Sequence, residues 1–146
     1  MKGKTKVILG IVTAILLILI FGIVGIIGYF YYSYSAKNES ALQNGEAFGR
    51  TSDKNGCVDD SLRQVRELNK KPSFSLTDGV RVSRFTSGCL TTAREVPKFC
   101  DTVPSPTDLI AAVNWVTEKC DSAGLDHTGP CNQIYAEVIK ACKKPR

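Results

Sequence analysis

Residues 105–142 read SPTDLIAAVNWVTEKCDSAGLDHTGPCNQIYAEVIKAC and contain two similar halves. In each half, apolar residues and cysteines recur at offsets of four, seven and eleven positions, the spacing of one helix face. A short stretch rich in glycine and aspartate separates the halves. The pattern therefore predicts an antiparallel pair of helices, each with a face that carries cysteines. These faces are Leu109, Val113, Val116 and Cys120 in the first half, and Cys131, Tyr135, Val138 and Cys142 in the second.

The ends of the two helices carry residues typical of helix termini. Ser105 is a suitable N-cap, Pro106 suits the first helical position, and Asp108 places an acid in the first turn. Gly124 is a suitable left-handed stop for the first helix, and Pro130 marks the start of the second.

A further helix is expected over residues 57–69. This stretch places Leu62, Val65 and Leu68 at helical spacing, and Pro72 follows as a stop.

Another helix is expected over residues 78–95, with Thr77 as its cap and Pro97 after its end. Its face consists of Val82, Phe85, Cys89 and Ala93. The sequence therefore predicts an all-α fold, with about four helices in a domain spanning residues 56–146.

That domain has few large apolar residues and needs another source of stability. From Ala36 to the end, 23 of 111 residues are Leu, Ile, Val or Phe, a level at which burial alone barely sustains folding. All six cysteines lie in this region, as expected of disulfides formed outside the cytoplasm.

The predicted helices favour one disulfide pairing among the fifteen that six cysteines allow. Cys120 and Cys131 flank the turn of the hairpin, and an antiparallel partner returns Cys142 toward the Cys100 segment. The remaining pair is then Cys57 with Cys89.

An uncharged run of 24 residues, Val7–Phe30, is long enough to cross a bilayer. Seventeen of its residues are Ile, Leu, Val or Phe, and as a helix it would extend about 36 Å. The lysines near the N-terminus (Lys2, Lys4 and Lys6) mark the cytoplasmic side, and tyrosines follow at the other end.

We therefore expect a single-pass protein of the cytoplasmic membrane with its C-terminal domain in the periplasm or outside the cell. Its predicted parts are a cytoplasmic tail (1–6), a transmembrane helix (7–32), a stalk (33–55) and the disulfide-linked domain (56–146). The first half of the stalk, around residues 39–48, can extend the membrane helix. The alternative is a signal peptide cleaved after Ser35, but its apolar region would be unusually long.

The distribution of charge argues against a nucleic-acid partner. From Ala36 onward there are 16 Lys and Arg against 14 Asp and Glu, so this part carries only +2 of the total +5. Because the signs are interspersed, no basic stripe remains. The bilayer is the expected lipid partner.

No arrangement of residues in the sequence predicts catalysis, a cofactor or a metal. There is no CxxC motif, so the pattern typical of thiol oxidoreductases is missing. The only histidine, His127, lies in a predicted turn without an obvious orienting partner. The adjacent acids Asp59 and Asp60 would diverge on a helix, and acids near a helix start ordinarily interact with the helix dipole.

Trp115 falls between the cysteine face and its flank. It is a candidate for a partner interface, and the alternative is a partly buried core residue.

A set of short motifs supports a resemblance covering about half the chain: Gly88-Cys89-Leu90, Phe99-Cys100-Asp101, Val103-Pro104, Trp115 and Cys120. The pattern resembles uncharacterised bacterial single-span envelope proteins with a six-cysteine helical periplasmic domain. The resemblance implies a periplasmic setting and no enzymatic activity.

These observations predict an interaction or accessory module of the cell envelope, with an envelope or membrane protein as partner. Two alternatives remain: a carrier of a small molecule or lipid, and, with least support, a thiol oxidoreductase.

Overall fold

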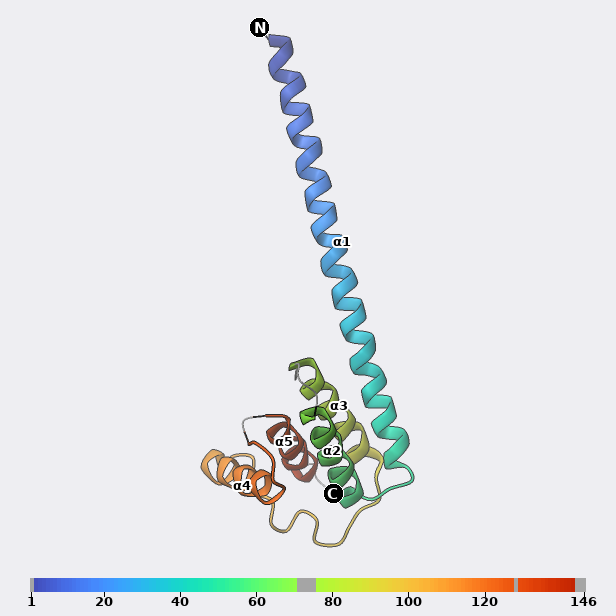
Figure 1. The fold of residues 1–146 in the computed structure, drawn as a ribbon, viewed down its shortest axis with the longest axis vertical. Helices are drawn as coiled ribbons and strands as arrows, with labels where there is room; N and C mark the ends of the chain where they lie inside the picture. Colours follow the sequence, from blue (N-terminus) through green and yellow to red (C-terminus); the bar gives the residue numbers. More distant parts are fainter. Residues whose placement is uncertain (1, 71–75, 128, 144–146) are drawn as a thin grey trace. The chain divides into compact units, whose positions relative to one another are not determined.

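The computed structural model describes the backbone of residues 2–70, 76–127 and 129–143, and these residues form five helices without a β-strand (Figure 1). The predicted all-α class is therefore confirmed. The chain divides into two units, Met1–Ala36 and Lys37–Arg146. The helices are α1 (Lys2–Gly49), α2 (Lys54–Asn69), α3 (Leu76–Thr92), α4 (Leu109–Ser122) and α5 (Pro130–Lys143).

The first unit is helical and belongs to α1. Its described large apolar side chains are exposed, among them Ile20, Val24 and Ile27. Within the described residues, no helix combines the length and hydropathy that a membrane crossing requires.

The end of α1 belongs to the second unit, and the expected helical extension over residues 39–48 is present. This segment differs from a simple spacer because it packs directly on α3. Gly45 faces the backbone of Phe85, and Thr92 Oγ1 donates a 2.8 Å hydrogen bond to the carbonyl of Glu46. The small glycine brings the two helix backbones into contact, so part of the predicted stalk is built into the domain.

The second helix, α2, begins three residues before the predicted start at Cys57. Asp53 caps it by accepting a 2.8 Å hydrogen bond from the backbone N–H of Gly56. Pro72, the expected stop, lies outside the described residues.

The third helix, α3, includes Thr77, so this residue is not the predicted cap. The helix ends at Thr92 instead of Glu95 because the chain then pairs with the turn before α2. In that pairing the Arg94 N–H donates to the Ser52 carbonyl, and the Lys54 N–H donates to the Arg94 carbonyl.

The N-cap of α4 is Asp108, and the predicted cap Ser105 is wrong. Asp108 Oδ1 accepts a 3.0 Å hydrogen bond from the Ala111 N–H. Residues 105–108 form a turn closed by the bond from the Asp108 N–H to the Ser105 carbonyl. Pro106 occupies the second position of this turn, which its fixed φ favours over the helix.

The predicted stop of α4 is confirmed. Gly124 adopts a φ of +67°. Its N–H bonds to the Asp121 carbonyl, while the Leu125 N–H bonds to the Cys120 carbonyl. These bonds form a Schellman motif, and Leu125 is buried beyond it.

The core lies among α2, α3 and α5, and α4 packs beside α5 (Figure 1). Ile134, Val65 and the sulfurs of Cys57 and Cys89 are among its most buried groups. The face predicted for α4 is wrong in its first half, since Leu109 and Val113 are 73% and 64% exposed. Only the C-terminal half of that face, with Val116 and Cys120, reaches the core.

The three disulfides are Cys57–Cys89, Cys100–Cys142 and Cys120–Cys131, the pairs that the predicted helix arrangement favours. The first joins α2 to α3, the second holds the segment after α3 against α5, and the third closes the α4–α5 turn. Each helix of the domain after α1 is thus covalently tied to a neighbour.

Candidate binding cleft

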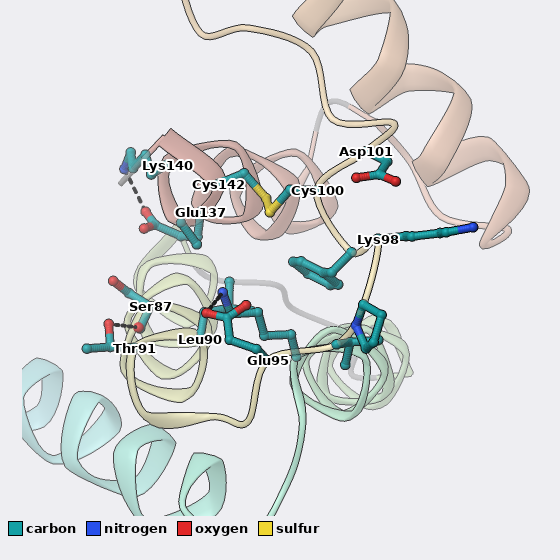
Figure 2. Close-up of a pocket in the computed structure, with 15 residues that line it drawn as sticks. Ser87, Leu90, Thr91, Glu95, Lys98, Cys100, Asp101, Glu137, Lys140 and Cys142 are labelled. Carbon is teal, nitrogen blue, oxygen red and sulfur yellow. Dashed lines mark hydrogen bonds and ion pairs between the residues drawn. A yellow bond between two sulfur atoms is a disulfide. The ribbon is translucent and has the colours of Figure 1, made fainter. Parts of the chain in front are cut away.

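A cleft of about 870 Å³ lies on one side of α3 and α5. Its third wall is the segment 95–101, which connects α3 to the region before α4 (Figure 2). Leu90, Phe99 and Cys142 contribute apolar lining, while Ser87 and Thr91 add hydroxyls from α3. The cleft thus combines an apolar lining with polar groups, as ligand sites do.

The segment 95–101 is held at both ends. At its start, Arg94 pairs with the turn before α2, and at its end the Cys100–Cys142 disulfide joins it to α5. Between these points Lys98 adopts a φ of 65°, which is uncommon for a residue with a side chain. The bond from the Asp101 N–H to the Lys98 carbonyl closes this tight turn. Such unfavourable backbone conformations concentrate at functional sites.

Lys54 is a buried cation in the lining of the cleft. Its side chain is 8% exposed, and its Nζ lies 2.6 Å from Oε1 of Glu95. The ammonium also lies 5.8 Å from the centre of the Phe99 ring, within range of a cation–π interaction. In contrast, the Glu95 side chain is 80% exposed. The ion pair therefore joins a buried cation to an anion in solvent.

The α5 wall carries a second charge pair. Glu137 accepts hydrogen bonds from Ser83 Oγ at 3.3 Å and from Lys140 Nζ at 2.7 Å. Figure 2 shows Glu137 and Lys140 together on this wall, near the Cys100–Cys142 bridge, and Glu95 beside Leu90. This pair is also unequal in burial, but in the opposite sense: the Glu137 side chain is 13% exposed and that of Lys140 is 68% exposed. Lys54 is therefore the enclosed cation of the two pairs.

The residues considered for catalysis lie apart from the cleft lining. His127 has a partner that the sequence did not suggest, since its Nδ1 lies 3.5 Å from Oδ1 of Asp121. Both side chains are largely exposed, so this is a surface contact. Asp60 accepts hydrogen bonds from Arg63 and Gln64 of its own helix, a local structural role. Among the described residues, no group of three or more His, Cys, Asp and Glu side chains could hold a metal.

Trp115 is partly buried and packs against the core. Its ring meets Tyr135 edge to face with centroids 5.4 Å apart, and Lys119 Nζ lies 5.9 Å from the ring centre. Its buried Nε1 has no hydrogen-bond partner in the part of the chain that the structure describes. The exposed apolar residues of this helix are instead Leu109, Ile110 and Val113.

Sequence reasoning missed the cleft because its defining pair is 41 residues apart in the chain. One signal was present in the sequence: Lys54 directly follows Asp53, the N-cap. A cation in the first turn opposes the helix dipole and needs a compensating anion.

The fold and cleft define a small disulfide-linked helical domain. No protein-family model, curated protein or solved structure matches this chain.

Proposed function

We propose that this chain is a single-pass membrane protein whose extracytoplasmic domain binds a protein partner of the cell envelope through the cleft, without catalysis. The observation that carries the proposal is the cleft itself. It has an apolar lining, and its walls are tied to one another by a disulfide and by the pairing at Arg94. Such a fixed frame lowers the entropy lost when a partner binds.

The membrane anchor is proposed from the sequence of residues 7–32. Val7–Phe30 is uncharged, and α1 is apolar on all sides here instead of on one stripe. A helix that is hydrophobic all round must be buried in protein or lipid. The lysines before it and the aromatics after it support the orientation with the domain outside the cytoplasm.

The extracytoplasmic setting is supported by the pairing of all six cysteines. Disulfides persist in oxidising compartments such as the bacterial periplasm or the cell exterior. Four of the six cysteines (Cys57, Cys89, Cys120 and Cys131) have no exposed surface, which argues against the thiol oxidoreductase alternative for their two disulfides. The Cys100–Cys142 disulfide is half-buried in the lining of the cleft.

The anchor is tested by extracting membranes with alkaline carbonate and measuring the mass of the full chain. We expect the protein to stay in the membrane pellet with residues 1–35 intact. A mature protein that begins at Ala36 and is released into the supernatant would overturn the anchor.

The protein partner is tested with a photo-crosslinking amino acid at Thr91, an exposed residue that lines the cleft. The matched control places the same group at Asn132, which is exposed and is not part of the lining. We expect one envelope protein to crosslink from position 91 alone, and the purified pair to reproduce the adduct. Equal adducts from both positions, or none, would contradict the proposal.

A small-molecule carrier is the second candidate, favoured by the volume of the cleft. About 870 Å³ lies within the range of ligand pockets, roughly 300–1,000 Å³. Native mass spectrometry of the protein from its own membranes distinguishes the two. A co-purified ligand that blocks the crosslink from position 91 would favour the carrier.

A further inference from the structure

The difference in burial between Lys54 and Glu95 indicates which charge a ligand of the cleft carries, which the volume of the cleft does not indicate. The ammonium of Lys54 is enclosed by the protein, while the carboxylate that neutralises it extends into solvent. If Glu95 turned away, its carboxylate would be hydrated, but the cation would remain enclosed. A buried charge without a partner is strongly unfavourable, so an anion beside Lys54 stabilises its charged form.

The position of Lys54 in the fold strengthens this requirement. It is the first residue of α2, where the helix dipole places a partial positive charge. The neighbouring Asp53 carboxylate is engaged as the cap of the Gly56 N–H. The Phe99 ring offers its face to the ammonium but carries no net charge. Glu95 is thus the acid that pairs with Lys54, and it is attached to the wall of the cleft.

We propose that Glu95 occupies an anion subsite in the free protein and that a carboxylate of a bound peptide segment replaces it on Lys54. This inference rests on the proposed function, because it names the chemistry of the partner that enters the cleft. Leu90 and Phe99 line the same cleft, so the recognised segment carries an acidic residue flanked by apolar side chains. Displacement has little cost for Glu95, since its side chain regains full hydration when it leaves.

The pair Glu137–Lys140 on the α5 wall does not offer a second subsite for an anion, because here the anion is the enclosed partner. Lys140 is 68% exposed, so its charge is already hydrated and screened. A ligand carboxylate gains more from a buried ammonium than from an exposed one, because the surrounding dielectric is lower. Lys54 is therefore the residue that selects the acidic group.

The test uses the full chain in detergent micelles and two probes, acetyl-Phe-Glu-Phe-amide and acetyl-Phe-Gln-Phe-amide. Binding is followed by the NMR shifts of the backbone amides of Leu90 and Phe99. We expect saturable binding of the glutamate peptide and at least tenfold weaker binding of the glutamine peptide. Equal binding of the two peptides would overturn the subsite.

Two substitutions separate an anion subsite from a purely structural ion pair. Glu95→Gln removes the competing carboxylate and is expected to tighten binding of the glutamate peptide at least threefold. Lys54→Met is expected to weaken it at least tenfold, while Lys70→Met, in an exposed ion pair outside the cleft, leaves it unchanged. If the pair is only structural, both changes lower the melting temperature and Glu95→Gln leaves peptide binding unchanged or weaker, which would overturn the inference. The Glu95→Gln arm remains decisive even if Lys54→Met fails to fold.

The crosslink from position 91 distinguishes failure of the inference from failure of the proposed function. A partner adduct that persists in Glu95→Gln and Lys54→Met alike, together with equal binding of the two peptides, overturns the subsite and leaves the interaction module intact. Loss of the adduct in the unsubstituted protein overturns the module, whatever the peptides do.

Discussion

Gly88 of α3 lies against the backbone of Leu42 in α1. A Cβ at Gly88 would overlap the carbonyl oxygen of Leu42 and come within 3.1 Å of the Glu46 nitrogen. The end of α1 therefore packs on α3 backbone to backbone. A polar, glycine-containing stretch thus becomes an integral helix of the domain.

Gly88→Ala should destabilise the domain by about 1–3 kcal/mol, the usual cost of forcing an extra methyl group into a filled site. The overlapping atoms belong to the backbone, so no side-chain rotation relieves them. Chemical unfolding followed by near-ultraviolet circular dichroism measures the loss. Gly25→Ala is the control because nothing lies within 4 Å of a Cβ there. Equal stability of the two variants would contradict the close contact.

Removing the Cys100–Cys142 disulfide by changing both residues to Ala should cost roughly 4 kcal/mol, because the bond closes a loop of 42 residues. It should also free the cleft segment, so that the Asp101 amide loses protection from hydrogen exchange. The paired change Cys120→Ala and Cys131→Ala is the comparison. That bond closes a shorter loop, for roughly 3 kcal/mol, and its loss should leave Asp101 protected. Loss of protection in both variants would show that the segment is not held locally.

Alkaline pH should weaken the domain through Tyr135. Burial raises the pKa of its hydroxyl above the ordinary value of 10.0, and the negative charge of Asp59 adds to the effect. The folded state thus favours the neutral phenol. Its contribution to stability is complete below about pH 10 and is lost as the pH rises through the folded pKa.

Tyr135→Phe keeps the ring and removes this titration. Between about pH 8 and pH 11, the unfolding free energy of the unsubstituted protein should therefore fall more steeply than that of the variant. Parallel curves would show that Tyr135 does not contribute to the pH dependence.

Trp115→Phe should change stability by less than about 1 kcal/mol. The change gives up part of the contact with Tyr135 but removes a buried N–H that lacks a partner in the described part of the chain, a group that costs about 1–3 kcal/mol. Trp115→Ala should cost about 3 kcal/mol because the ring contact is lost entirely. Calorimetric unfolding measures both. Equal losses in the two variants would mean that the indole N–H makes a stabilising hydrogen bond.

The elements that the sequence predicted well depend on interactions close together in the chain. The stop at Gly124 needs only a left-handed residue after α4. The faces with Val82, Phe85 and Cys89 on α3, and with Cys131, Tyr135 and Val138 on α5, follow from helical periodicity and are buried as expected. Element order and cysteine positions then favoured the disulfide pairs.

The predictions that failed depended on competition between local and distant contacts. Ser105 and Asp108 are both good caps, and the turn around Pro106 decided for Asp108. The apolar pattern of Leu109 and Val113 predicted a buried face, but α4 reaches the core only through its later turns. Periodicity shows which residues share a face, but it does not show how far along the helix a neighbour extends.

The sequence by itself determined the helical class and the buried faces of α3 and α5, and it favoured the observed disulfide pairs, because each follows from the order and spacing of residues along the chain. Only the tertiary structure decided the cleft and its chemistry. The ion pair between buried Lys54 and exposed Glu95 joins residues 41 positions apart. The packing of α1 on α3 joins residues up to 46 positions apart. Such contacts form only when whole helices approach one another. That approach depends on packing, desolvation and chain connectivity across the domain, so no short stretch of sequence predicts it.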